Sequence, residues 1–115
     1  MNYKPYKHPN MWQAIKNLLG FGPSVEYKEL IKKGAIVVDV RSKAEYAGGH
    51  IRNSVNIPLD TLSNQLGKLK SKEQVVITCC QSGRRSGIAK GILKSKGYTQ
   101  VYNGGGWYSL QQKLK

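Results

Sequence analysis

The chain has 115 residues, of which 39% are hydrophobic and 22% are charged, so it has the length and composition of one globular domain and not of a disordered chain. It contains no stretch of about 18 apolar residues, so we expect no membrane span. The N-terminus lacks the pattern of a secretory signal. The two cysteines, Cys79 and Cys80, are neighbours and are poorly placed to form a disulfide framework. We therefore expect a cytoplasmic protein in a reducing compartment.

The net charge is +13, and it is distributed unevenly along the chain. Every acidic residue lies at or before Glu73, whereas residues 74–115 carry only basic charges. A surface of this sign indicates an anionic partner, such as a small anion, a nucleic acid or a membrane surface. Charge alone does not decide among these classes, and lysines outside any motif also serve solubility.

Residues 1–23 are predicted to form an N-terminal extension of a domain at 24–115. The first part of this extension contains Pro5 and Pro9, and apolar residues then recur at helical spacing over residues 11–19. We expect a short amphipathic helix there. Because the helix is short and only weakly basic, we expect it to pack on the domain rather than on a membrane.

Segments rich in β-branched and apolar residues alternate with segments of helical spacing along the rest of the chain. Strands are predicted at residues 35–40, 54–57, 74–79 and 99–102. Helices are predicted at residues 25–33, 42–49, 60–66, 85–96 and 107–114. This alternation predicts an α/β fold with a mostly parallel sheet, in which the functional site lies beyond the carboxyl ends of the strands.

Some residues have expected places within these elements. Asp60 is placed to cap the helix at 60–66. The three glycines at 104–106 are expected to form a flexible turn. The apolar residues of helix 85–96 share one face, which should be its buried face: Ile88, Ala89, Ile92 and Leu93.

Cys80 stands between the predicted strand 74–79 and the predicted helix that follows. The start of a helix presents unpaired N–H groups and a partial positive charge, and both favour a thiolate over a thiol. Gly83 allows the backbone to turn so that several N–H groups point at one centre, while Arg84 and Arg85 add positive charge. Cys80 is therefore predicted to be a nucleophile. A thiolate formed in this way needs no histidine as a general base. The role of nucleophile requires a sulfur that solvent can reach.

Cys79 occupies the last position of the predicted strand, so its side chain should point to the opposite face of the sheet from Cys80. We expect a packed core thiol. A resolving or sulfur-accepting role for Cys79 is the alternative.

Three groups of residues resemble the signatures of rhodanese-like domains. They are, first, Asp39-Val40-Arg41, Glu45-Tyr46, Gly49-His50-Ile51 and Asn56-Ile57-Pro58; second, Cys80-Gln81-Ser82-Gly83-Arg84-Arg85-Ser86; and third, Gly104-Gly105 followed by Trp107. Their order over about residues 24–114 makes the resemblance specific. It implies a three-layer α/β/α fold with a central, mostly parallel five-stranded sheet.

The resemblance also implies a thiosulfate sulfurtransferase of the single-domain type. Cys80 would take the outer sulfur of a small anionic donor such as thiosulfate as a persulfide, and would pass it to a thiol or to cyanide. The residues expected to bind substrate, mainly through N–H groups that cradle the sulfur, are Gln81, Ser82, Gly83, Arg84, Arg85 and Ser86. Arg84 is expected to meet the anion. Asp39, Arg41 and His50 are expected to give structural support, and neither a metal nor a cofactor is expected.

Related phosphatases and arsenate reductases carry a loop one residue longer than the one from Cys80 to Arg85, so the resemblance favours sulfur transfer over phosphate hydrolysis. Two further hypotheses stay open. A persulfide carrier would use the same loop to hand sulfur to a relay protein or to a tRNA-modifying enzyme, and we do not expect nucleic acid itself to be the partner. A redox module would instead join Cys79 and Cys80 under oxidation.

Overall fold

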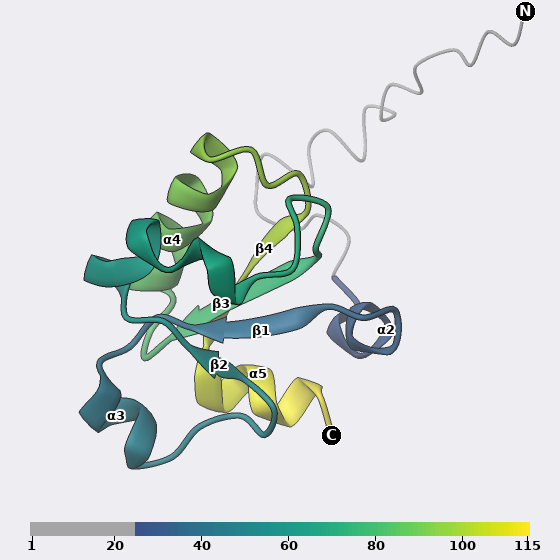
Figure 1. Ribbon diagram of the computed structural model, residues 1–115. Coiled ribbons are helices and arrows are strands. Elements are labelled where there is room, and N and C mark those ends of the chain that lie inside the picture. The colour runs from purple at the N-terminus through teal and green to yellow at the C-terminus, as the bar shows by residue number, and fades with distance from the viewer. Residues whose placement is uncertain (1–24) are drawn as a thin grey trace, which may run out of the picture.

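The computed structural model describes residues 25–115 (Figure 1). The extension at 1–23, with its predicted helix, lies outside the described residues. The helices, 3₁₀ helices (η) and strands are α2 (Tyr27–Lys32), β1 (Ile36–Asp39), α3 (Lys43–Ala47), β2 (Val55–Asn56), η1 (Leu59–Asn64), η2 (Leu66–Lys68), β3 (Val76–Cys80), α4 (Arg84–Ser95), β4 (Val101–Gly106) and α5 (Trp107–Lys113). Within residues 25–115, every helix is too short or too polar to span a lipid bilayer. The cytoplasmic location stays a prediction.

The strands form one parallel sheet in the order β2-β1-β3-β4. In the register of the central strands, Val38 of β1 pairs with Thr78 of β3, and Val76 of β3 pairs with Val101 of β4. The expectation of five strands is wrong for the described residues, whose sheet has four. The four strands overlap the four that the sequence predicted, although β4 runs to Gly106 instead of ending at residue 102. The fifth was implied by the resemblance alone, and residues 25–115 hold no further run of β-branched residues.

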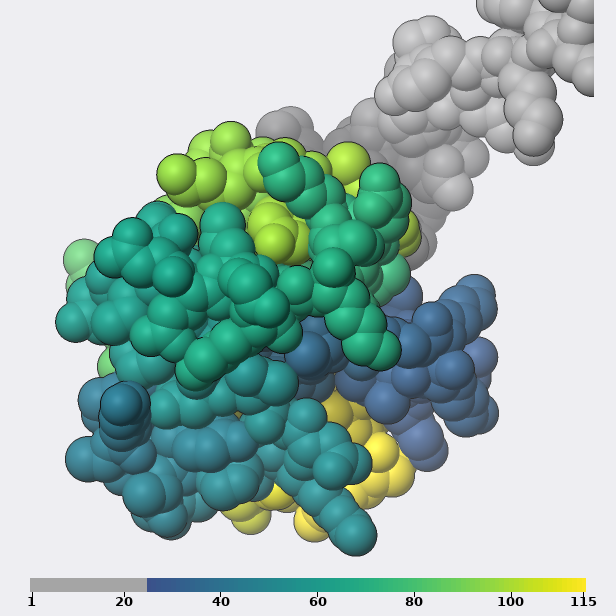
Figure 2. Space-filling model, viewed as in Figure 1, coloured from purple at the N-terminus to yellow at the C-terminus, as the bar shows by residue number. Residues whose placement is uncertain are grey.

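Helices cover both faces of the sheet, which gives three layers (Figure 1). Val38 faces a core shared with Leu62 of η1 and Leu93 of α4. Its neighbour Val37 faces the other core, shared with Leu110 of α5. The alternation follows from the period of a strand, which sends successive side chains to opposite faces. On the first face, the segment of η1 and η2 closes over the sheet (Figure 2).

The segment after β2 differs from the predicted helix at 60–66. It forms η1 and η2, and Pro58 rather than Asp60 precedes η1, with no side-chain cap. Short 3₁₀ pieces are usual for connectors that cannot bury a continuous helical face. Here Leu62 alone of η1 is fully buried, while Leu59 and Leu66 are partly buried and pack against the same core.

The buried face of α4 also differs from the expectation. Ala89 and Leu93 are buried as predicted, but Ile88 is 52% exposed. The inward face of the helix includes Ser86, which is buried and polar. Because Ser86, Ala89 and Leu93 follow the i, i+3, i+7 spacing, the face is rotated away from Ile88. The apolar pattern could not reveal this, because a polar residue occupies part of the buried stripe.

The three glycines at 104–106 do not form a flexible turn. They are the last residues of β4. A Cβ atom on Gly104 would lie 2.8 Å from Leu110 Cδ2 and 2.9 Å from Ile77 Cγ2. A Cβ atom on Gly106 would lie 2.9 Å from the carbonyl oxygen of Gln81. Glycine is therefore needed here for close packing between β4 and its neighbours.

Candidate active site

The sulfur of Cys80 lies inside the loop that joins β3 to α4. The N–H of Gly83 donates a hydrogen bond to Cys80 Sγ at 3.0 Å, and the N–H of Ser86 donates one at 3.4 Å. Gly83 precedes α4 with a φ of 96°, a left-handed conformation that glycine adopts without strain. The predicted cradle of N–H groups is therefore present around the sulfur.

These hydrogen bonds change the acidity of Cys80. Burial raises the pKa of the thiol, but the Ser86 hydroxyl and the N–H groups of Ser86, Ser82 and Gly83 lower it, so that the pKa lies below the ordinary value of 9.0. Hydrogen bonds to a thiolate favour the charged form. The loop therefore promotes the nucleophilic form of Cys80, as its place before a helix predicted.

The sulfur is nevertheless covered. Cys80 exposes 0% of its surface and packs with the core residues Val40 and Ala89. The expectation of a sulfur that solvent can reach is wrong for this conformation. The reason is that β3 continues through Cys80 and the following loop folds back, so that Gly83 and Ser86 close over the side chain.

Cys79 lies in the core on the opposite face of the sheet, as expected. It packs with Ile77 and Leu110. Burial raises its pKa far above the ordinary range, and the negative charge of Asp39 adds to the rise. Cys79 and Cys80 are both free thiols. Their pKa values shift in opposite directions because the two side chains face different environments.

The two arginines of the loop have different surroundings. Arg85 donates to both carboxylate oxygens of Glu45 in α3, at 2.7 and 2.8 Å. The pKa of Glu45 is lowered from 4.5 to about 2, mainly by the hydrogen bonds from the Arg85 guanidinium and to a smaller extent by the backbone N–H of Ser42. Arg84 is exposed and forms no ion pair within residues 25–115. Of the two charges that the sequence indicated, only that of Arg84 stays uncompensated.

Asp39 and Arg41 form a buried ion pair at the carboxyl end of β1. Arg41 Nη2 is 2.7 Å from Asp39 Oδ2, and the side chains are 3% and 0% exposed. Arg41 also donates to the carbonyl oxygen of Gly49 at 2.7 Å, and its guanidinium lies 4.7 Å from the ring centroid of Trp107. The pair therefore ties the end of β1 to the segment after α3 and to the start of α5.

His50 is exposed and contacts its own turn. Its Nδ1 lies 2.7 Å from the carbonyl oxygen of Tyr46, and the two rings stack with centroids 3.7 Å apart. This agrees with the structural role expected for His50.

Asn103 and Thr78 belong to the site but were not singled out from the sequence. Asn103 Nδ2 donates to the carbonyl oxygen of Gly83 at 3.1 Å, and Asn103 Oδ1 accepts from Ser86 Oγ at 2.7 Å. Thr78 Oγ1 donates to the carbonyl oxygen of Ser86 at 2.9 Å. The only signal in the sequence was that a polar residue directly precedes the three glycines. Those glycines bring β4 close to the loop, since a Cβ atom on Gly83 would lie 3.2 Å from Gly105 Cα.

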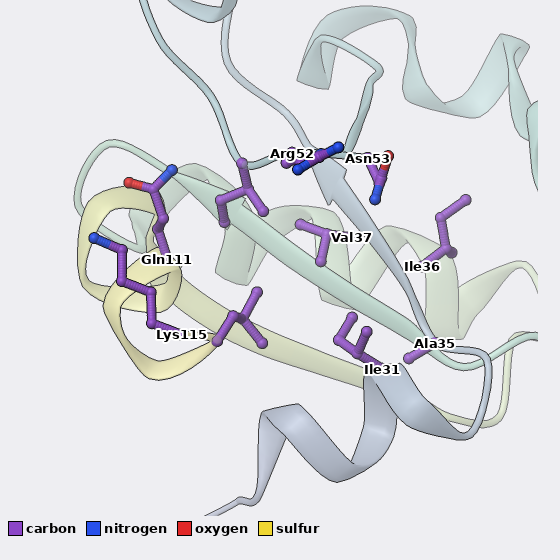
Figure 3. Close-up of a pocket in the computed structure, with 10 residues that line it drawn as sticks. Ile31, Ala35, Ile36, Val37, Arg52, Asn53, Gln111 and Lys115 are labelled. Carbon is purple, nitrogen blue, oxygen red and sulfur yellow. The ribbon is translucent and has the colours of Figure 1, made fainter.

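The described part of the fold has two larger hollows, of which one borders the Cys80 loop. One, of about 560 Å³, lies beside Arg85 and is lined by Lys43 of α3 and by Leu59 and Asp60 of η1. The other, also about 560 Å³, is largely apolar and lies between α2, α5 and the loop after α3, away from the Cys80 loop (Figure 3). Only the first shares a residue with that loop. Among residues 25–115, no group of three or more His, Cys, Asp or Glu is arranged to hold a metal ion.

The chain is similar to known proteins. The sequence model of the Rhodanese-like domain matches residues 24–113. Thiosulfate sulfurtransferase PspE of Escherichia coli (strain K12) is 39% identical over 70 residues, which are 60% of this chain and 67% of PspE. Putative sulfur carrier protein YrkF of Bacillus subtilis (strain 168) is 36% identical over 67 residues, 58% of this chain and 36% of YrkF.

The structure described as rhodanese with anions from E. coli superposes with a TM-score of 0.61 at 36% identity, covering 65% of this chain and 89% of that one. The family match spans the sheet, the Cys80 loop and the glycines of β4 together. The chain therefore belongs to the rhodanese-like domain family.

Proposed function

We propose that the protein is a sulfurtransferase that carries sulfane sulfur as a persulfide on Cys80. The Cys80 thiolate attacks the outer sulfur of thiosulfate, a sulfur–sulfur bond to Cys80 forms, and sulfite leaves with the electron pair of the broken bond. An acceptor thiolate or cyanide then attacks the outer sulfur of the persulfide and releases Cys80 as a thiolate. No net oxidant or reductant is needed in either half-reaction.

One observation carries this proposal: hydrogen bonds from the N–H groups of Gly83 and Ser86 reach the sulfur of Cys80 and favour its charged form. The same loop, residues 81–86, would hold the added sulfur. Arg84 is exposed and free of an ion pair within the described residues, so it is available to meet the anionic donor. Asp39, Arg41 and His50 act at a distance, by fixing the loops around α3.

The covered sulfur adds a step to the reaction. Because Cys80 exposes 0% of its surface, the loop at 81–83 must move aside before a donor can reach Sγ. Gln81 and Ser82 are exposed and carry no side-chain hydrogen bond within residues 25–115, so such a movement costs mainly the hydrogen bonds of Gly83 with Cys80 and Asn103.

Thiocyanate formation from thiosulfate and cyanide by the purified protein tests the proposal. We expect turnover in the wild type and in Cys79→Ala, and loss of turnover in Cys80→Ser, because only Cys80 lies in the cradle. Turnover by Cys80→Ser at the wild-type rate would refute the proposal.

A persulfide carrier is the second candidate, and the covered sulfur favours it. A sulfur held under a loop is protected from small thiols until a partner protein opens the site. YrkF, named as a putative sulfur carrier protein, is a relative. The two candidates differ in the second half-reaction: a carrier forms the persulfide with the donor but turns over slowly with small thiols or cyanide. Fast turnover with those acceptors would rule out a purely carrier role.

A further inference from the structure

The hydroxyl of Ser86 has one hydrogen and two acceptors within reach. Ser86 Oγ lies 2.7 Å from Asn103 Oδ1 and 3.4 Å from Cys80 Sγ. A hydroxyl has a single O–H donor, so it cannot donate to both at once. The short contact places the hydrogen on the Asn103 side. The contact between Ser86 and Cys80 then has the S–H of Cys80 as its donor, which suits a neutral thiol.

The amide of Asn103 cannot turn its oxygen away from Ser86. Oδ1 also accepts from the N–H of Gly105 at 3.0 Å, and Nδ2 donates to the carbonyl oxygen of Gly83 at 3.1 Å. If the amide oxygen and nitrogen were exchanged, the NH₂ group would face the N–H of Gly105, and the oxygen would face the carbonyl oxygen of Gly83. Asn103 is therefore a fixed acceptor for the Ser86 hydroxyl.

We propose that Asn103 is a positioning residue for the sulfur chemistry: it holds the hydrogen of the Ser86 hydroxyl while Cys80 is neutral, and the hydroxyl turns to the sulfur when Cys80 becomes an anion. The inference rests on the proposed role of Cys80. When the thiol gives its proton to solvent, the sulfur no longer has a hydrogen to donate. The Ser86 hydroxyl then rotates, donates to the thiolate and breaks its bond to Asn103, while Asn103 keeps its bonds to Gly83 and Gly105.

The same rotation reverses after sulfur transfer. The inner sulfur of a Cys80 persulfide is bonded on both sides and carries no full negative charge, so Asn103 Oδ1 becomes the better acceptor again. Asn103 thus competes with the thiolate for one hydrogen. This competition holds the thiolate less tightly than Ser86 alone would, and it leaves the thiolate a better nucleophile.

Other charged and titratable groups lie on the elements that flank the Cys80 loop. They are Asp39 and Arg41 at the end of β1, Cys79 on β3, Glu45 on α3, and Arg84 and Arg85 at the start of α4. Asp39 is paired with Arg41, and Glu45 is paired with Arg85. Asp60 of η1 lines the hollow beside Arg85. None of these groups is hydrogen-bonded to the Ser86 hydroxyl. Changing Asn103 and Ser86 together therefore distinguishes the effect of the hydroxyl on the pKa of Cys80 from the effect of the charged groups.

Titration of the thiolate by its ultraviolet absorbance tests the inference on the full chain without any sulfur donor. Cys80→Ser supplies the blank for the tyrosines and for Cys79. Asn103→Ala should lower the apparent pKa of Cys80 by about half to one unit, because the hydroxyl is no longer shared and a hydrogen bond is worth about 1 kcal/mol. In the Ser86→Ala background, Asn103→Ala should not lower the pKa.

A merely structural role gives a different pattern. If Asn103 only supports the loop, its removal loosens the N–H cradle and raises the pKa of Cys80 in both backgrounds. That result, or an unchanged pKa in both, overturns the inference. The wild type could instead form no thiocyanate while the effect of Asn103→Ala on the pKa of Cys80 still depends on Ser86. That result would refute the proposed function and leave this inference standing.

Asn103→Asp serves if Asn103→Ala does not fold, because the side chain keeps its size and the acceptor Oδ1, while the bond from Nδ2 to Gly83 is lost in both variants. A carboxylate accepts the Ser86 hydrogen more strongly and also repels the thiolate directly. The rise in the pKa of Cys80 should therefore be larger with Ser86 present than in the Ser86→Ala background. Equal rises in both backgrounds would overturn the inference.

Discussion

Glu45 and Arg85 meet side chain to side chain between α3 and the start of α4, joined by hydrogen bonds of 2.7 and 2.8 Å across 40 positions of sequence. Glu45 also accepts from the backbone N–H of Ser42 and so completes the cap of α3. One carboxylate thereby links the helix cap to the loop that holds Cys80. Arg85 is oriented by this pair instead of being free to bind an anion.

Glu45→Gln should weaken the fold in a pH-dependent way. The pKa of Glu45 is lowered from 4.5 to about 2, so the pair stabilises the folded state fully above 4.5, and this contribution is lost as the pH falls toward 2. Because both side chains are more than a third exposed, the contribution is at most about 1 kcal/mol. Urea unfolding should give the wild type a larger free energy of unfolding than Glu45→Gln at neutral pH. This difference should become smaller as the pH falls. A difference that grows in acid would contradict this assignment.

Asp39→Asn should be far more damaging than the loss of a surface pair. It leaves the guanidinium of Arg41 buried without its carboxylate, which costs about 3–5 kcal/mol. The matched control is Glu29→Gln, whose pair with Lys32 is 56% and 70% exposed, and which should change the free energy of unfolding by less than about 0.5 kcal/mol. Denaturant midpoints measure both. Similar losses for the two variants would show that the Asp39 pair is not the anchor described here.

Gly104→Ala tests whether the glycines of β4 are needed for close packing. The new methyl would meet Leu110 and Ile77 at 2.8 and 2.9 Å, and we expect a loss of about 1–3 kcal/mol from overpacking. Gly91→Ala is the control, because a Cβ atom there meets nothing within 4 Å and the residue lies in α4. It should stabilise the protein by about 0.5–1 kcal/mol. If Gly104→Ala melts at the wild-type temperature, the segment is the flexible turn that its composition suggests.

Cys80 and Cys79 should react at very different rates with a small alkylating reagent. Cys80 has the lowered pKa and only its loop above it, so it should react in the folded protein, with a rate that levels off at a pH below 9.0. Cys79, whose pKa burial raises, should react only on unfolding. Peptide mapping after timed alkylation assigns each thiol. Equal rates for the two residues would show that the loop does not select Cys80.

The sequence revealed most of the fold and the location of the site. Three strands of the sheet coincide with predicted apolar runs, β4 overlaps its prediction only at residues 101–102, and Cys80 stands at the junction of β3 and α4 as its flanking residues predicted. These features are local, so a single sequence carries them. The helical spacing likewise located α2, α4 and α5 to within a few residues.

The features that the sequence did not reveal depend on contacts between distant segments. The neutralisation of Arg85 depends on Glu45, and the support of Ser86 depends on Asn103, each from another part of the chain. The burial of Cys80 depends on how its loop folds back, which no spacing of residues expresses. The exposure of Ile88 was also missed. Ser86 is buried on the inner face of α4, and its hydrogen bond to a distant residue allows a polar side chain to interrupt the apolar pattern.

Intact-mass spectrometry of the protein after incubation with thiosulfate shows whether Cys80 carries sulfur as a persulfide. We expect that the wild type gains the mass of one sulfur atom, that the gain maps to Cys80 and is removed by cyanide, and that Cys79→Ala behaves alike. No gain in the wild type, or a gain in Cys80→Ser that maps to Cys79, would contradict it.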